Sequence, residues 1–177
     1  MKPARLPTTR LLTAIAAVGI VLFGVAAAAY IWFMGAIAAP GPLIAPTTVI
    51  VAPGTGVSAI GRQLASAGVV TQSWLPALAA RRTGLERSLK PGEYHFDPGV
   101  SVLDVLNKLS RHDVVARFVT IPEGLVIADI RAILDNTEGL MGDLTTQVAD
   151  GDVLPETYRY EWGDKRNDIV VRMRNAR

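Results

Sequence analysis

Glu156 has the surroundings most typical of a catalytic carboxylate in this chain. It lies in the stretch GDVLPETYRYEWGDKRN, residues 151–167, and Tyr158, Tyr160 and Trp162 follow it closely. An apolar, aromatic environment disfavours the ionised carboxylate, so the pKa rises and the group can act as a general acid. The same position suits a turn residue whose carboxylate accepts hydrogen bonds from backbone amides at a helix entry. Glu156 is therefore either a substrate contact or a turn residue.

The other ionisable residues suggest no catalytic or metal centre. The chain has no cysteine, which excludes disulfides and thiolate metal sites, and its two histidines, His95 and His112, are too isolated to form one. Glu123 precedes an expected helix, where an acidic group is favoured by the helix dipole. Glu138 and Glu161 resemble solvated loop residues. The sequence therefore predicts no metal and no cofactor.

The charge distribution argues against a nucleic-acid partner. The sequence pI is about 9.1, with 18 basic and 16 acidic residues. The only charged residues before Arg62 are Lys2, Arg5 and Arg10. The rest of the chain therefore contains 15 basic and 16 acidic residues and is nearly neutral. The basic excess is an N-terminal arm, residues 1–10, and not a binding face.

Residues 11–39 form an uncharged apolar run. About 20 apolar residues cross a bilayer core, and aromatic residues near the end of this run favour the interface. The basic arm before it predicts a cytoplasmic N-terminus, with the C-terminal part outside the cytoplasm. A cleaved signal peptide ending near residues 36–38 is the alternative. Because signal-peptide apolar regions run only about 7–15 residues, we expect an uncleaved single-pass anchor.

Beyond a proline-rich linker, residues 40–47, periodicity predicts an α+β fold. Ser101 and Asp104 resemble a capping box, and Ser73 is a possible cap for an earlier helix. The segment 137–150 is ambiguous because glycines interrupt its helical spacing. The expected elements are strands at 49–51, 92–96 and 114–121, helices at 57–67 and 73–83, and helices after Pro98, after Pro122 and from Ile169.

Three stretches together resemble a known family. They are LKPGEYHFDPGVSVLDVLNKLSRHDVV, RFVTIPEGLVIADIRAIL and DGDVLPETYRY. The order of a Gly-x-Tyr strand, a Pro-Gly turn with its helix, an IPEG segment and a PETYR element is similar to that of the endolytic murein transglycosylases, also called MltG or YceG-like proteins. The membrane anchor in front of them fits as well.

The resemblance implies an organisation and a function. Residues 48–118 would form a LysM-like strand–helix–helix–strand module, and residues 119–177 the start of the transglycosylase domain. The family cuts nascent peptidoglycan strands between MurNAc and GlcNAc, which leaves 1,6-anhydro ends. Its implied partners are glycan strands and the synthesis or division proteins of the cytoplasmic membrane.

The family mechanism needs one glutamate, because the sugar's own 6-hydroxyl is the nucleophile, whereas ordinary glycosidases need two carboxylates. In the family this glutamate lies in an A-S-I-V-E-K-E-like segment after the PETYR element. No stretch of this sequence matches that segment before Arg177. We therefore expect these residues to be inactive alone and assign no catalytic residue.

Glu156, Tyr158 and Tyr160 are the predicted cleft-lining residues. The two tyrosines alternate with Arg159, so they share one side of an extended segment, where they either stack on sugar or pack in the core. The alternative function is a non-catalytic, membrane-anchored module that binds peptidoglycan or division proteins.

Overall fold

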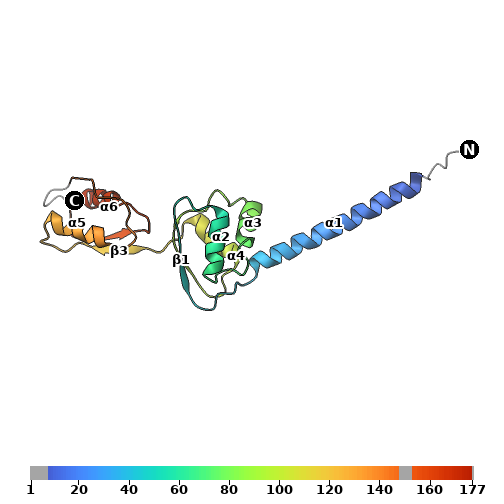
Figure 1. The fold of residues 1–177 in the computed structure, drawn as a ribbon, viewed down its shortest axis with the longest axis horizontal. Coiled ribbons are helices and arrows are strands. Elements are labelled where there is room, and N and C mark those ends of the chain that lie inside the picture. Colours follow the sequence, from blue (N-terminus) through green and yellow to red (C-terminus); the bar gives the residue numbers. More distant parts are fainter. Residues whose placement is uncertain (1–7, 148–152, 177) are drawn as a thin grey trace, which may run out of the picture. The chain divides into compact units, whose positions relative to one another are not determined.

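The structure is a computed structural model that describes residues 8–147 and 153–176. It divides into two compact units, residues 1–39 and 40–177, which are described separately. The described part of the first unit is one helix, α1 (Thr8–Ala38) (Figure 1). Its stretch Leu12–Ala38 has a mean hydropathy of 2.4 and is long and apolar enough to cross a membrane. The predicted apolar helix is confirmed, whereas residues 1–7 of the basic arm lie outside the described residues.

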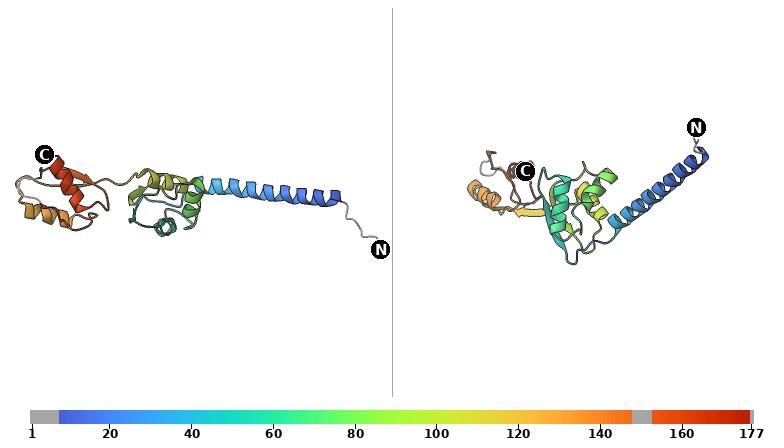
Figure 2. Two further views of the ribbon diagram at one scale, coloured as in Figure 1. Left: turned by 90° about the horizontal axis from the view of Figure 1, so that it is seen from above. Right: turned by 45° about the vertical axis from the view of Figure 1, so that its right-hand side comes forward.

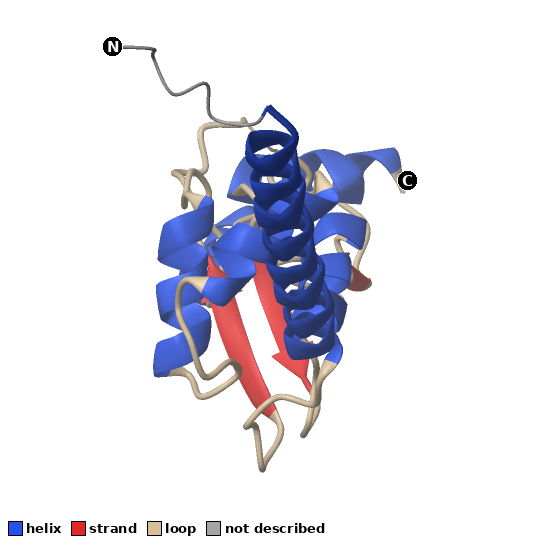
Figure 3. Cartoon of the chain, turned by 90° about the vertical axis from the view of Figure 1, so that its right-hand side faces the viewer, coloured by secondary structure: helices blue, strands red, loops and turns tan. Residues whose placement is uncertain are grey.

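The second unit begins with a strand–helix–helix–strand arrangement, as predicted. Strands β1 and β2 pair antiparallel, with Val49 opposite Tyr94, and Figure 3 shows two strands side by side among the helices. We call the group from β1 to α4 the first module. Its elements are β1 (Thr47–Val51), α2 (Val57–Ser66), α3 (Leu75–Thr83), β2 (Gly92–Phe96) and α4 (Val102–Arg111).

The helices of the first module cover apolar side chains of its sheet. Helices α2 and α4 contact the strands, and α3 packs against both helices (Figure 2). Tyr94 and Phe96 point the same way from β2 and are almost completely buried. Gly61 allows α2 to approach α3 closely, because a Cβ there would collide with the carbonyl oxygen of Ser73.

The start of α4 follows the predicted capping box. The Ser101 hydroxyl accepts a hydrogen bond from the Asp104 amide at 3.1 Å and donates one to the Asp104 carboxylate at 2.6 Å. The prediction for α3 is wrong in one detail. Its N-cap is Trp74, with no side-chain cap, and not Ser73.

The linker lies against the first module. The Gly41 amide donates to the carbonyl oxygens of Gly99 and Val100, and the Gly99 amide donates to that of Leu43. Leu43 is buried. The linker is non-helical, as its prolines predict, and residues 41–43 already belong to the packed structure.

The second module has its own sheet and core. Strands β3 and β4 pair antiparallel, with Val119 opposite Tyr158. Between α5 and β4, Met141 forms an isolated bridge with Lys165, and residues 137–147 contain no helix. Residues 148–150 of the ambiguous segment lie outside the described residues. The elements are β3 (Arg117–Thr120), α5 (Ile127–Asn136), β4 (Thr157–Tyr160) and α6 (Arg166–Asn175). Strand β3 is shorter than predicted.

We predict that Gly92→Ala destabilises the first module strongly. Gly92 has φ +147°, and a Cβ there would lie 2.6 Å from Cγ1 of Val114. Strain and overpacking together are expected to lower the free energy of unfolding by about 2–4 kcal/mol. Urea denaturation of the full chain in mild detergent measures this. Gly56→Ala is the control, because Gly56 has open space and φ −70°; equal losses in both variants would contradict the prediction.

Tyr94 should make stability fall at high pH. Burial first, and then the negative charges of Glu161 and Asp113, raise the pKa of Tyr94 from 10.0 to about 12. The folded state holds the Tyr94 proton more tightly than the unfolded state does. The resulting contribution to the free energy of unfolding is therefore complete below pH 10 and is lost as the pH rises through about 12. Tyr94→Phe should remove this part of the pH dependence. Denaturation at pH 8 to 12 tests it, and an unchanged slope above pH 10 would be evidence against it.

Candidate functional site

Strands β3 and β4 bring the IPEG and PETYR segments together. The Ile121 amide donates to the carbonyl oxygen of Glu156 at 2.9 Å, directly after the last paired residues, Thr120 and Thr157. The hydroxyls of these two threonines lie 2.8 Å apart. Two segments more than 30 residues apart in the sequence therefore meet at one end of this sheet.

The structure places Tyr158 and Tyr160 in the core of the second module. The Tyr158 hydroxyl donates to the Leu154 carbonyl at 2.6 Å, and the Tyr160 hydroxyl donates to that of Glu138 at 3.0 Å. Burial, and then the charge of Glu156, raises the pKa of Tyr158. Both rings share one side of β4, as their spacing predicts, and that side is the interior.

The opposite side of the same sheet is exposed. Phe118 is 64% exposed, and the neighbouring Thr120, Thr157 and Arg159 are exposed as well. Phe118 is paired with Arg159 across the strands. Glu156 is exposed at the end of this sheet. We call Phe118, Thr120, Thr157 and Arg159 the outer face, and Glu156 adjoins it at the end of the sheet. With the nearby Glu156 carboxylate, the outer face offers one aromatic ring and hydroxyl and guanidinium groups, which is a surface able to stack on and hydrogen-bond to a polyhydroxylated ligand.

An ion-pair network surrounds an open pocket beside β4. The pocket has a volume of about 300 Å³ and is lined by Arg159, Tyr160, Glu161, Asp164 and Arg172. Arg172 pairs with Asp164 at 2.5 Å and donates to the carbonyl of Arg159 at 2.8 Å, and Arg159 pairs with Glu161 at 3.3 Å. Because each of its carboxylates contacts a cationic side chain, the network does not resemble the apolar site of a general acid.

Glu161 is not the solvated loop residue that the sequence suggests. Its carboxylate lies 2.8 Å from Nε2 of His112, and its side chain is 29% exposed. His112 caps the C-terminus of α4 in the left-handed conformation, with φ +58°. This contact joins α4 of the first module to the end of β4 in the second. Glu138, in contrast, is 75% exposed, as predicted.

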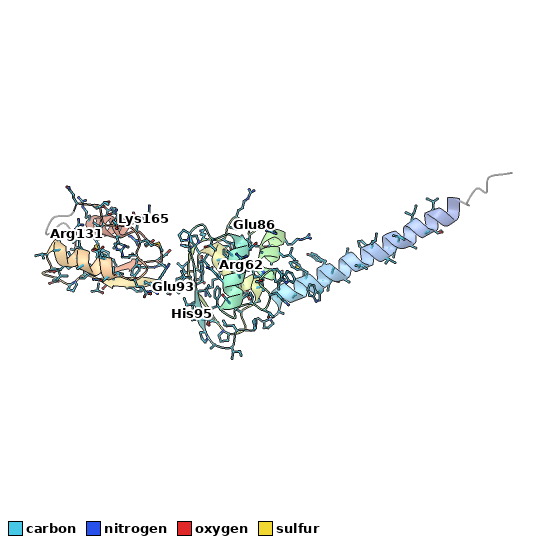
Figure 4. All side chains as sticks on the ribbon, in the orientation of Figure 1. Arg62, Glu86, Glu93, His95, Arg131 and Lys165 are labelled. Carbon is cyan, nitrogen blue, oxygen red and sulfur yellow. The ribbon has the colours of Figure 1, made fainter. Side chains whose placement is uncertain are left out.

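The second contact between the modules is an ion pair that sequence analysis missed. Glu93 on β2, labelled in Figure 4, is buried and accepts hydrogen bonds from Arg117 with both carboxylate oxygens, at 2.5 and 3.0 Å. The Arg117 guanidinium also lies 4.9 Å from the ring centroid of Trp162. The hydrogen bond to Glu93 is the main cause that raises the pKa of Arg117. No sequence signal pairs residues 93 and 117, since only the fold brings them together.

No group of three or more possible metal ligands occurs within residues 8–147 and 153–176. The outer face therefore offers mainly polar groups, whereas the rings of Tyr158 and Tyr160 lie in the core of the second module. The same module contains an exposed carboxylate, Glu156, without the enclosed apolar surroundings that a general acid requires.

The folded chain is an α+β protein with two small antiparallel sheets and an apolar N-terminal helix that could span a membrane. The profile of the YceG-like family matches residues 49–177, so the chain belongs to the YceG-like family. This confirms the family resemblance of the three sequence stretches.

Among solved structures, the chain is similar to a YceG-like protein from Listeria monocytogenes, with 18% identity and a TM-score of 0.40. The match covers 74% of this chain and 54% of the Listeria chain, so the present chain spans about half the length of that protein. No curated protein matches the sequence significantly.

We predict that breaking the Glu93–Arg117 pair lowers the free energy of unfolding by about 3 kcal/mol. Glu93→Gln keeps the shape of the side chain but leaves a guanidinium that is only 26% exposed with the exposed Glu138 carboxylate, at 3.4 Å, as its remaining charge partner. The double variant with Arg117→Met should lose less stability than the sum of the two single variants, because the guanidinium that has lost its buried partner is then absent. Urea denaturation of the full chain measures both.

Glu86→Gln is the matched control for this experiment. Glu86 pairs with Arg81 at 3.3 Å, but these side chains are 45% and 58% exposed. An exposed pair contributes about 0–1 kcal/mol. If Glu86→Gln and Glu93→Gln were equally destabilising, the burial of Glu93 would have no energetic role.

Proposed function

We propose that this chain holds peptidoglycan glycan strands as part of an endolytic lytic transglycosylase. The observation that carries the proposal is the match of the YceG-like family over residues 49–177, with the Gly-x-Tyr, IPEG and PETYR segments in family order. In this family the reaction separates MurNAc from GlcNAc and leaves a 1,6-anhydro end. The chain would act on nascent strands, beside the synthesis and division proteins of the membrane.

The proposed location follows from α1. We propose that α1 crosses the cytoplasmic membrane once, with the basic arm in the cytoplasm and residues 40–177 outside it. An enzyme that acts on nascent glycan strands needs this arrangement, because those strands are made at the outer surface of the cytoplasmic membrane.

The proposed glycan contact is the outer face. The Phe118 ring can stack on a sugar ring, while Arg159 and the two threonines supply donors for its hydroxyls. Of the three predicted cleft residues, we keep Glu156 as a direct contact. Tyr158 and Tyr160 support it, because their hydroxyls hold the segments around β4 in place.

The first module is the second proposed glycan contact. Its order β1, α2, α3, β2 is the strand–helix–helix–strand order of LysM-like modules. The Gly41 and Gly99 hydrogen bonds attach the linker to it, so the module would be held close to the membrane, where new strands emerge.

Cleavage is proposed to need a glutamate in an A-S-I-V-E-K-E-like segment, which these 177 residues do not contain. Residues 40–177 would then bind and position a strand without cutting it. The alternative, a non-catalytic peptidoglycan-binding or division module, shares this binding step.

We predict that Phe118→Ala weakens binding to peptidoglycan about tenfold or more, since burying one aromatic side chain contributes about 1.5–3 kcal/mol. Co-sedimentation of the detergent-solubilised full chain with purified sacculi measures the affinity. Val171→Ala, at an apolar residue that is 47% exposed on α6, is the matched control and should leave the affinity unchanged.

Two results would count against the proposal. Absence of sedimentation with sacculi would remove glycan binding altogether. Release of 1,6-anhydro products by this chain would show that it cuts, and would place a catalytic acid among its own residues.

A further inference from the structure

Helix α3 ends with basic residues, and more basic residues lie in the loop that follows it. Arg81 and Arg82 lie in the last turn of α3, and Arg87 and Lys90 follow in the next loop. All four are exposed. The only acidic residue among them, Glu86, pairs with Arg81. Within the described part of the chain, the other three cations form no ion pair.

The exposed side of α3 also carries an indole. Trp74, the N-cap of the helix, is 50% exposed, whereas the inner side of α3 is buried. Trp74 and Arg81 are seven residues, or about two turns, apart, so they share one side of the helix at a separation of about 10 Å along its axis. We give the name basic face to Trp74 together with the four cations, all of which are exposed on α3 or in the loop that follows it. Glu86, the acidic residue of this segment, is labelled in Figure 4.

The basic face belongs to a module with a very short tether to α1. Helix α1 ends at Ala38, and Gly41 is already hydrogen-bonded to Gly99 and Val100. Three residues span at most about 10 Å, whichever way the module is turned. If α1 crosses a membrane, the attachment point of the module at Gly41 therefore lies within about one Debye length of the end of the helix, a distance over which anionic headgroups attract cations.

We propose that the basic face binds anionic phospholipid headgroups of the membrane that α1 crosses. The inference rests on the proposed membrane location. Three unpaired cations supply the electrostatic attraction, and the amphipathic Trp74 ring suits the water–lipid interface. The short tether favours lipid over a soluble acidic partner, because it makes the local lipid concentration high. Such binding would hold the first module against the membrane in one orientation.

The test uses the full chain in nanodiscs with a spin label. Because the chain has no cysteine, Thr83→Cys at the end of α3 gives a single labelled site. The label's accessibility to a water-soluble relaxing agent is compared in discs of phosphatidylcholine alone and in discs with equal parts of phosphatidylglycerol. We expect accessibility to fall in the anionic discs and to recover at high salt.

Charge reversal provides the matched comparison. The double variant Arg82→Glu/Arg87→Glu should weaken the protection of the label from the relaxing agent at least about tenfold. The reason is that each cation near an anionic surface contributes roughly fivefold to the binding constant. Lys165→Glu/Arg174→Glu makes the same change in charge at two exposed residues of the second module and should leave the protection intact.

Three outcomes would overturn the inference. They are equal accessibility in both kinds of disc, equal losses in both double variants, and protection that appears only when peptidoglycan is added, which would assign the basic face to wall polymer. If the chain incorporates into discs but shows no protection, the inference fails while the proposed location stands. If it does not incorporate at all, the location and the inference fail together.

Discussion

The ion pair between Glu93 and Arg117 is the interaction on which the arrangement of the family segments depends. A buried carboxylate is tolerated only when its charge and hydrogen bonds are satisfied. Both Glu93 oxygens accept hydrogen bonds from one guanidinium, whose Cζ lies over the Trp162 ring at 4.9 Å from its centroid. Three family stretches thus contribute to one contact: the Gly-x-Tyr strand, the strand before IPEG and the loop after PETYR. The His112–Glu161 contact adds a second connection between the same two modules.

This constraint determines which side of β3 and β4 faces outward. With Arg117 and Tyr160 opposite each other on the inner side, Phe118 and Arg159 must point to solvent, because side chains alternate along a strand. The tyrosines that resemble ligand-stacking groups in the sequence are then interior residues, held by hydrogen bonds to backbone carbonyls. The exposed aromatic ring is Phe118, which belongs to the proposed glycan contact. The basic face is a separate surface, for which we propose contact with lipid.

Several parts of the fold could be predicted because their causes are local. Ser101 and Asp104 cap α4 as expected, since a capping box needs only residues three apart. The β1–α2–α3–β2 order follows from short periodic runs separated by glycine and proline turns. Glu161 was misjudged because a charge run after Tyr160 resembles a solvated loop, and its partner, His112, lies 49 residues earlier. Segment 137–147 also lacks a helix, because its glycines outweigh its apolar spacing.

The amino-acid sequence alone was sufficient for the apolar N-terminal helix, the α+β class, the order of the elements and the family, because all of these depend on composition, short-range spacing and local motifs. It was also sufficient to show that Tyr158 and Tyr160 share one side of a strand. Only the folded structure shows that this side is buried, that Phe118 is exposed, and that Glu93 meets Arg117. The physical reason is that alternation defines two sides of a strand, whereas the elements packed against it decide which side is removed from water.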